Sequence, residues 1–140
     1  LPLEAYLPDN YIPDSRQKIS FYKKIANLKT TEGREELEVE LQDRFGTIPE
    51  SVNILLDIAE LKHNCQEVGV ERISTSEEKI KITFNQERTS VNPQKVIVLI
   101  QQDKRISLIP PSQLQIDSRG LSGRNLVLVI RSILNKLQNS

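Results

Sequence analysis

The chain has 140 residues, of which 37% are hydrophobic, and its 19 Lys and Arg residues balance its 19 Asp and Glu residues. A chain of this length buries roughly two-thirds of its unfolded surface on folding, which is enough for a core without disulfides or metal ions. It has no apolar run of the ~18 residues that span a membrane and no signal-peptide pattern at its start, so we expect a soluble protein without membrane contact.

Residues 1–13 are predicted to form an extended arm, because three prolines prevent a continuous helix there. We expect this arm to lie across the surface. Asp14 can cap a first helix that runs to about residue 29. The side chains expected to point inward from this helix are Ile19, Tyr22, Ile25, Ala26 and Leu28.

Two further helices are predicted before residue 69. Thr31 can cap a second helix over residues 32–45, and Pro49 fits the first turn of a third helix that ends near Val68. The third helix is apolar over much of its girth, so we expect it to lie between neighbours. Residues 14–68 are therefore predicted to form a layer of three helices.

The second half, residues 69–140, mixes strands and helices. Apolar and polar residues alternate in some of its segments, as they do in half-buried strands, and Asn92 followed by Pro93 is typical of a helix start. We expect strands at 70–75, 80–84, 106–109 and 114–116, and helices at about 93–100 and 122–137.

The predicted order is three helices, two strands, a helix, two strands and a helix. Because strands and helices do not alternate regularly, this order indicates an α+β fold and not a doubly wound nucleotide-binding sheet. The chain has no internal repeat and no long linker. We therefore expect one domain over residues 1–140, with a small β-sheet and two further helices after the helical layer.

The cysteine and methionine content bears on the origin of the chain. A single cysteine cannot form an internal disulfide, which fits a reducing cytoplasm. The chain contains no methionine and begins with Leu1. We therefore expect it to be a piece of a longer, cytoplasmic protein.

No residue pattern of a common catalytic or cofactor site is found. The five glycines form neither a GxxxxGK[ST] loop nor a GxGxxG loop. His63 and Cys65 are two residues apart on a predicted helix and so point about 200° away from each other. Too few further donors are present for a four-ligand zinc site. We expect no metal, no cofactor and no enzymatic activity in this domain, although the sequence leaves open a carboxylate pair in a cleft.

Acidic residues are concentrated in residues 32–60, which hold nine Asp and Glu against two Arg. Part of this charge favours the helix dipole near residue 32. Glu40 and Asp43, however, share a helix face opposite the apolar stripe, with Glu36 one turn earlier. We expect an exposed acidic stripe here, and a simple solvated face is the alternative interpretation.

The acidic stripe ends in the segment Asp43-Arg44-Phe45-Gly46-Thr47-Ile48-Pro49. Phe45 ends an apolar stripe, Gly46 can adopt the left-handed conformation that closes a helix, and Pro49 can start the next helix. These three residues are predicted to form a structural corner between two helices. Folding does not explain Asp43 and Arg44.

This segment carries a resemblance to a known family. Residues 36–49, followed by Leu55-Leu56-Asp57-Ile58-Ala59 and preceded by Tyr11-Ile12-Pro13-Asp14, resemble the C-terminal domain of bacterial transcription-repair coupling factors. The resemblance covers essentially the whole chain, and after residue 70 it rests mainly on pattern. The DRFG-x-x-P core is its most specific part.

The resemblance implies a role that the residues alone do not. Proteins of this family are ATP-driven DNA translocases that displace stalled RNA polymerase and recruit excision-repair proteins. Their terminal domain packs on the N-terminal UvrB-like module and masks the surface that binds UvrA, as an autoinhibitory clamp. By this resemblance Glu40, Asp43 and Arg44 are expected at that interdomain contact, with the carboxylates facing arginines of the module.

Two other classes of function stay open. The chain could be a nucleic-acid-binding or protein-interaction module that uses Lys18, Lys23, Lys24 or the basic final helix to contact phosphates. Few aromatic residues, zero net charge and the acidic stripe argue against DNA binding. The chain could also be an enzyme, which would require a deep pocket with converging titratable side chains.

Overall fold

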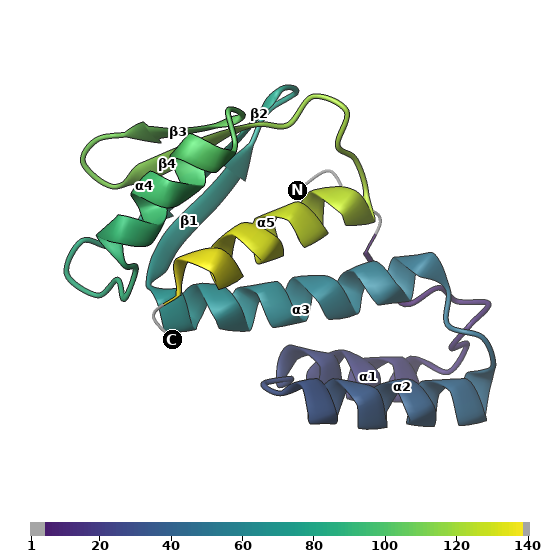
Figure 1. Cartoon of the computed structure of the whole chain (residues 1–140). Coiled ribbons are helices and arrows are strands. Elements are labelled where there is room, and N and C mark those ends of the chain that lie inside the picture. The colour runs from purple at the N-terminus through teal and green to yellow at the C-terminus, as the bar shows by residue number, and fades with distance from the viewer. Residues whose placement is uncertain (1–4, 139–140) are drawn as a thin grey trace. The chain divides into compact units, whose positions relative to one another are not determined.

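The structure, a computed structural model, describes residues 5–138. The chain folds into two compact units, which we call the N-terminal unit (Pro2–His63) and the C-terminal unit (Asn64–Ser140) (Figure 1). Residues 1–4 of the predicted arm lie outside the described residues. The single-domain organisation expected for residues 1–140 stays a prediction.

The order of helices and strands agrees with the order predicted from the sequence, and the α+β fold class is confirmed. Three helices are followed by two strands, a helix, two further strands and a final helix (Figure 1). The elements are α1 (Ser15–Ala26), α2 (Thr31–Phe45), α3 (Glu50–Val68), β1 (Val70–Thr75), β2 (Lys79–Phe84), α4 (Pro93–Gln102), β3 (Ile106–Ile109), β4 (Gln113–Asp117) and α5 (Arg124–Leu137).

Helix α1 begins at its predicted cap but buries a different side. The Asp14 carboxylate accepts hydrogen bonds from the backbone N–H groups of Arg16 and Gln17, at 2.8 and 3.1 Å. The helix ends at residue 26, three residues before the predicted end. The buried side chains are Phe21 and Ile25, which are four residues apart and therefore share one face.

The predicted inward stripe of α1 was therefore partly wrong. Ile19 is 56% exposed and Tyr22 is 37% exposed. The Tyr22 hydroxyl accepts a hydrogen bond from the Leu7 N–H at 2.9 Å, which holds the tyrosine at the rim of the core. Consecutive side chains of a helix point only about 100° apart, so the sequence pattern fits an inward face centred on either Phe21 or Tyr22. Tertiary packing selects the face that contains Phe21.

Helix α2 is capped by Thr30 and not by Thr31 as predicted. The Thr30 hydroxyl accepts a hydrogen bond from the Gly33 N–H at 2.9 Å, so the helix begins one residue earlier. Leu37 and Leu41 are buried on its inner face, as their spacing indicates.

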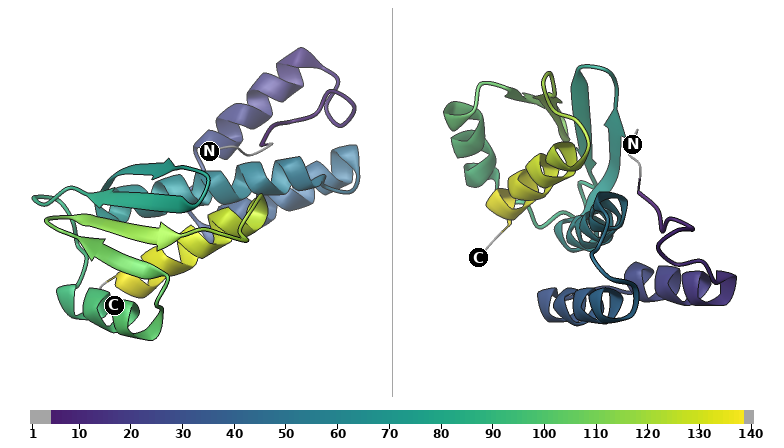
Figure 2. Two further views of the ribbon diagram at one scale, coloured as in Figure 1. Left: turned by 90° about the horizontal axis from the view of Figure 1, so that it is seen from above. Right: turned by 90° about the vertical axis from the view of Figure 1, so that its right-hand side faces the viewer.

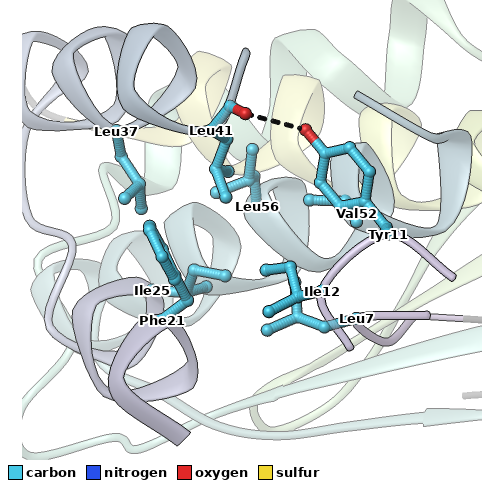
Figure 3. Close-up of a cluster of buried hydrophobic side chains, with 9 residues drawn as sticks. All are labelled: Leu7, Tyr11, Ile12, Phe21, Ile25, Leu37, Leu41, Val52 and Leu56. Atoms are coloured by element: carbon cyan, nitrogen blue, oxygen red, sulfur yellow. Dashed lines mark hydrogen bonds between the residues drawn. The ribbon is translucent and has the colours of Figure 1, made fainter. Parts of the chain in front are cut away.

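The core of the N-terminal unit is built from the arm as well as from the three helices (Figure 3). Leu7 and Ile12, both in the arm, are 2% and 0% exposed, so the arm contributes to the core instead of only crossing the surface. The Tyr11 hydroxyl donates to the carbonyl oxygen of Leu41, and burial raises its pKa. The core residues are Leu7, Tyr11, Ile12, Phe21, Ile25, Leu37, Leu41, Val52 and Leu56.

A buried ion-pair network joins α2 to α3 within the N-terminal unit. Arg34 Nη1 lies 2.7 Å from Asp57 Oδ1 and 2.6 Å from Glu60 Oε1. Arg34 is 8% exposed and Asp57 is 1% exposed. The sequence analysis counted these residues among the charges of residues 32–60 and assigned them no location. Their burial shows instead that part of this charge belongs to the interior.

The C-terminal unit contains one antiparallel sheet of four strands in the order β1-β2-β4-β3. Strand β2 pairs with both β1 and β4, and the register places Ile82 opposite Ile73 on one side and Leu114 on the other. Ile80, Ile82, Leu114 and Ile116 are almost fully buried on one face. Alternate residues of the same strands are polar and face the other way.

Two helices cover the apolar face of this sheet (Figure 2). Helix α4 starts at its predicted cap, where the Asn92 side chain accepts a hydrogen bond from the Gln94 N–H at 2.9 Å. Helix α5 carries the main apolar stripe of the unit, as predicted. Its buried residues are Leu126, Val127, Ile130, Ile133, Leu134 and Leu137.

We predict that the substitution Arg34→Met lowers the free energy of unfolding by about 3–5 kcal/mol, because it removes the guanidinium that neutralises two carboxylates in a buried setting. Chemical denaturation of the 140-residue chain measures this change. Arg16→Met is the matched control, because Arg16 is exposed, and should change stability by less than about 0.5 kcal/mol. Equal effects of the two substitutions would contradict the assigned role of Arg34.

Candidate functional site at the end of helix α2

The sequence-predicted site residues Glu40, Asp43 and Arg44 all lie in the last two turns of α2. Their spacing of three and four residues places Glu40 beside both of the others on the helix surface. Asp43 and Arg44 are exposed, whereas Glu40 is half-buried. The three residues therefore form one continuous surface at the helix end.

Glu40 is held between two cations, one of which the sequence analysis did not assign to this site. Lys24 Nζ lies 3.2 Å from Glu40 Oε1 and 3.1 Å from Oε2, and Arg44 Nη1 lies 3.0 Å from Oε2. The hydrogen bond from Lys24 lowers the pKa of Glu40 against the opposing effect of partial burial, and Arg44 adds to the lowering. We call Lys24, Glu40, Asp43 and Arg44 the charged edge.

Aromatic rings support the two cations of the charged edge. Lys24 Nζ lies 4.7 Å from the centroid of the Phe21 ring, and Arg44 Cζ lies 5.2 Å from the same centroid and 5.3 Å from that of Phe45. These distances allow cation–π attraction. The Phe21 and Phe45 rings meet edge to face, with centroids 5.5 Å apart. The positions of Lys24 and Arg44 thus depend on the core beneath them.

The charged edge is mixed in sign, which corrects the expectation of an exposed acidic stripe. It holds two cations and two carboxylates, and both cations pair with Glu40. Asp43 is exposed, and within residues 5–138 no ion pair or hydrogen bond is found for its carboxylate. Asp43 is therefore the carboxylate of this edge that a partner can reach without displacing another side chain.

A shallow groove between α1 and α2 runs beside the charged edge. Its volume is about 520 Å³, and Lys23, Lys24, Glu36 and Glu40 contribute charged groups to its walls, with Leu28 and Leu37 between them. The groove has both signs of charge and a small apolar floor. Such a surface suits a polar protein contact more than a small apolar ligand.

The helix corner that follows the charged edge consists of Phe45, Gly46 and Pro49. Gly46 has a φ of 90°, and its N–H donates to the carbonyl oxygen of Gln42 at 3.0 Å. Its own carbonyl oxygen lies 2.8 Å from the Tyr11 hydroxyl, whose single proton is shared between this carbonyl and that of Leu41. Pro49 lies one residue before α3 and not in its first turn as predicted, and its carbonyl accepts hydrogen bonds from the N–H groups of Val52 and Asn53. The arm thereby anchors the corner that presents Asp43 and Arg44.

The other residues considered for chemistry do not form a reactive site. Cys65 is half-buried, and burial raises the pKa of its thiol to about 11, so the thiol is neutral at pH 7. Across residues 5–138 there is no group of three or more His, Cys, Asp and Glu side chains that could hold a metal ion. In the same residues no helix is long and apolar enough to cross a membrane.

The fold and the charged edge together describe a small α+β domain with a polar surface at a helix corner, and comparisons with known proteins identify its family. The model of the TRCF domain matches residues 1–96. The crystal structure of the C-terminal domain of a transcription-repair coupling factor superposes with a TM-score of 0.82 at 31% identity, over 99% of this chain and 91% of that one. The chain belongs to the transcription-repair coupling factor family.

Relatives from several bacteria support this membership. The chain is 35% identical to the transcription-repair-coupling factor of Escherichia coli over 141 residues, which is 100% of this chain. It is 40% identical to that of Haemophilus influenzae over 103 residues and 36% identical to that of Bacillus subtilis over 98 residues, or 74% and 69% of this chain. It spans only 8–12% of the length of these relatives.

We predict that Gly46→Ala lowers the free energy of unfolding by about 1–3 kcal/mol, because residues other than glycine are strained at this positive φ. A Cβ at this position would meet no atom within 4 Å, so the loss would come from the backbone alone. Thermal or chemical denaturation measures it. The control is Thr47→Ala at the neighbouring exposed position, and an unchanged stability of the Gly46 variant would refute the role of the corner.

Proposed function

We propose that this chain is a regulatory docking domain of a transcription-repair coupling factor. In this proposal the parent protein is an ATP-driven DNA translocase that displaces stalled RNA polymerase and recruits excision repair. The domain binds the UvrB-like N-terminal module of the same parent and masks the surface that UvrA would use. The observation that carries the proposal is the charged edge, with Asp43 and Arg44 exposed beside a helix corner that is hydrogen-bonded to the arm.

The energetics of the charged edge suit a contact that must open again. Ion pairs that are largely open to solvent contribute about 0.2–1 kcal/mol each, and the pair between half-buried Glu40 and exposed Lys24 is close to this class, so a partner's charged groups can replace it at low cost. Complementary charges across an interface fix its register and speed its formation. A domain that docks through such pairs can be released when another protein competes for them.

The pairing within the charged edge also sets an order of contacts. A partner arginine can reach Asp43 directly, because that carboxylate is exposed. To reach Glu40 it must first displace Lys24 or share the carboxylate with Arg44. Lys24 is therefore an internal competitor of the partner module, and its strength sets part of the docking free energy.

The direct test of masking is the affinity of UvrA for the intact parent protein with and without these 140 residues. The proposal expects tighter UvrA binding after the deletion, because the masked surface becomes free. The measurement uses purified UvrA and both forms of the parent protein, for example by biolayer interferometry or isothermal titration calorimetry. Equal affinity for the two forms would refute the masking function.

A second prediction concerns the double substitution Glu40→Lys and Asp43→Lys in the intact parent. It should raise UvrA affinity about tenfold or more, because like charges facing each other across an interface cost several kcal/mol. The matched control is Glu32→Lys with Glu35→Lys, which makes the same charge change at the exposed start of α2. A similar effect of both pairs would place the contact elsewhere.

A third prediction follows from the competition by Lys24. The substitution Lys24→Met should strengthen docking about two- to fivefold, the equivalent of one exposed ion pair, and so weaken UvrA binding to the intact parent. Lys23→Met is the control, since it removes an equal charge from the neighbouring exposed position. The competition hypothesis is wrong if the double substitution weakens docking but Lys24→Met does not strengthen it. The charged edge would then dock without displacing Lys24.

A further inference from the structure

The zero net charge of the chain conceals a separation of charge between its two units. The C-terminal unit holds eleven Lys and Arg against seven Asp and Glu, which leaves a charge of +4. The N-terminal unit holds eight against twelve, which leaves −4. The predicted acidic stripe, which was the reason to expect repulsion of DNA, therefore lies in the N-terminal unit, whereas the excess of Lys and Arg lies in the C-terminal unit.

The open face of the β-sheet presents part of this positive charge. The strand register pairs Arg72 with Thr83, Lys81 with Ser74 and Gln115, and Lys79 with Asp117, so these side chains share the face opposite the buried isoleucines. Arg72, Lys79 and Lys81 are exposed. Within residues 5–138 no ion pair is found for these three cations.

Two arginines extend the positive face at one end, around a hollow of about 300 Å³. Arg119 pairs with Asp117 at 2.6 Å, and Arg105 pairs with Asp103 at 3.1 Å. Glu78 also lines the hollow. The face and its end therefore carry five cations and three carboxylates, and two of the carboxylates, Asp103 and Asp117, are neutralised by the two arginines. The remaining positive charge lies on β1 and β2.

We propose that this open sheet face binds the phosphate backbone of double-stranded DNA. Its positive charge complements a polyanion, and its Ser, Thr and Gln side chains can donate hydrogen bonds to phosphate oxygens. Binding of this kind is independent of base sequence. It would add a DNA contact to the domain without involving the charged edge of the N-terminal unit.

The composition of the face favours DNA over a protein partner. Protein interfaces have an apolar centre and are depleted in lysine, whereas this face has two lysines near its middle. Among the paired residues of this face, the large apolar one is Ile109, which lies on the edge strand β3. Among the described residues this face has no aromatic ring on which single-stranded bases could stack, because Phe84 of β2 is buried on the other face, so contact with a duplex backbone fits better than single-strand binding.

The test is fluorescence anisotropy of a labelled duplex of random sequence, titrated with the 140-residue chain at several salt concentrations. We expect binding in the micromolar range that weakens steeply as salt rises, because counterions are released. The triple variant Arg72→Gln, Lys79→Gln, Lys81→Gln should bind at least tenfold more weakly. Its log–log salt slope should be smaller by about 2–3, at about 0.9 per lost phosphate contact.

A matched control removes the same charge from the other unit. The variant Lys23→Gln, Lys29→Gln, Lys62→Gln changes three exposed lysines of the N-terminal unit and should bind the duplex within about twofold of the unsubstituted chain. The single variant Lys81→Gln guards against misfolding of the triple variant. It should reduce the salt slope by about 1 while its melting temperature stays unchanged.

Three results would overturn the proposal. The first is no anisotropy change at the lowest salt concentration. The second is an equal loss of binding in the triple variant and its control, which would indicate diffuse attraction by total charge. The third is displacement of the duplex by polyglutamate as effectively as by unlabelled duplex, which would make the face a surface for acidic proteins.

Discussion

The contact between the rings of Phe21 and Phe45 joins the core of the N-terminal unit to its charged edge. The two rings meet edge to face, and Tyr11 packs on Phe45 with a centroid distance of 5.7 Å. Such aromatic pairs contribute about 0.5–1.5 kcal/mol beyond the area that they bury. Because Lys24 and Arg44 lie over the same rings, the cluster that packs α1 on α2 also positions the cations that hold Glu40.

The two units stabilise their helices in different ways, and each way leaves a different surface free. In the N-terminal unit a buried arginine, Arg34, joins α2 to α3, and the exposed side of α2 carries charged residues such as Asp43. In the C-terminal unit α4 and α5 cover one sheet face, and the polar residues of the other face stay exposed. The proposed docking edge and the proposed DNA-binding face therefore lie in different units.

Local signals were sufficient for most of the fold. The caps at Asp14 and Asn92, the alternation in β2 and the stripe of α5 each follow from a few neighbouring residues, and each is found as predicted. The inward stripe of α1 was misplaced, because the burial of Phe21 instead of Tyr22 depends on contacts with other elements, among them the arm and Phe45 of α2. Burial of the arm itself depends on contacts with three helices that no local pattern reports.

The order of elements, the helix end at Gly46 and the family could all be predicted from the sequence, because they depend on spacing, backbone conformation and residue identity along the chain. Tertiary structure alone decided which charges are paired. Lys24 lies 16 residues from Glu40, and Arg34 lies 23 residues from Asp57. Helical spacing brings together only residues three or four positions apart, so it predicts neither ion pair. Charge pairing depends on distances of a few ångströms between separate elements, and only packing sets those distances.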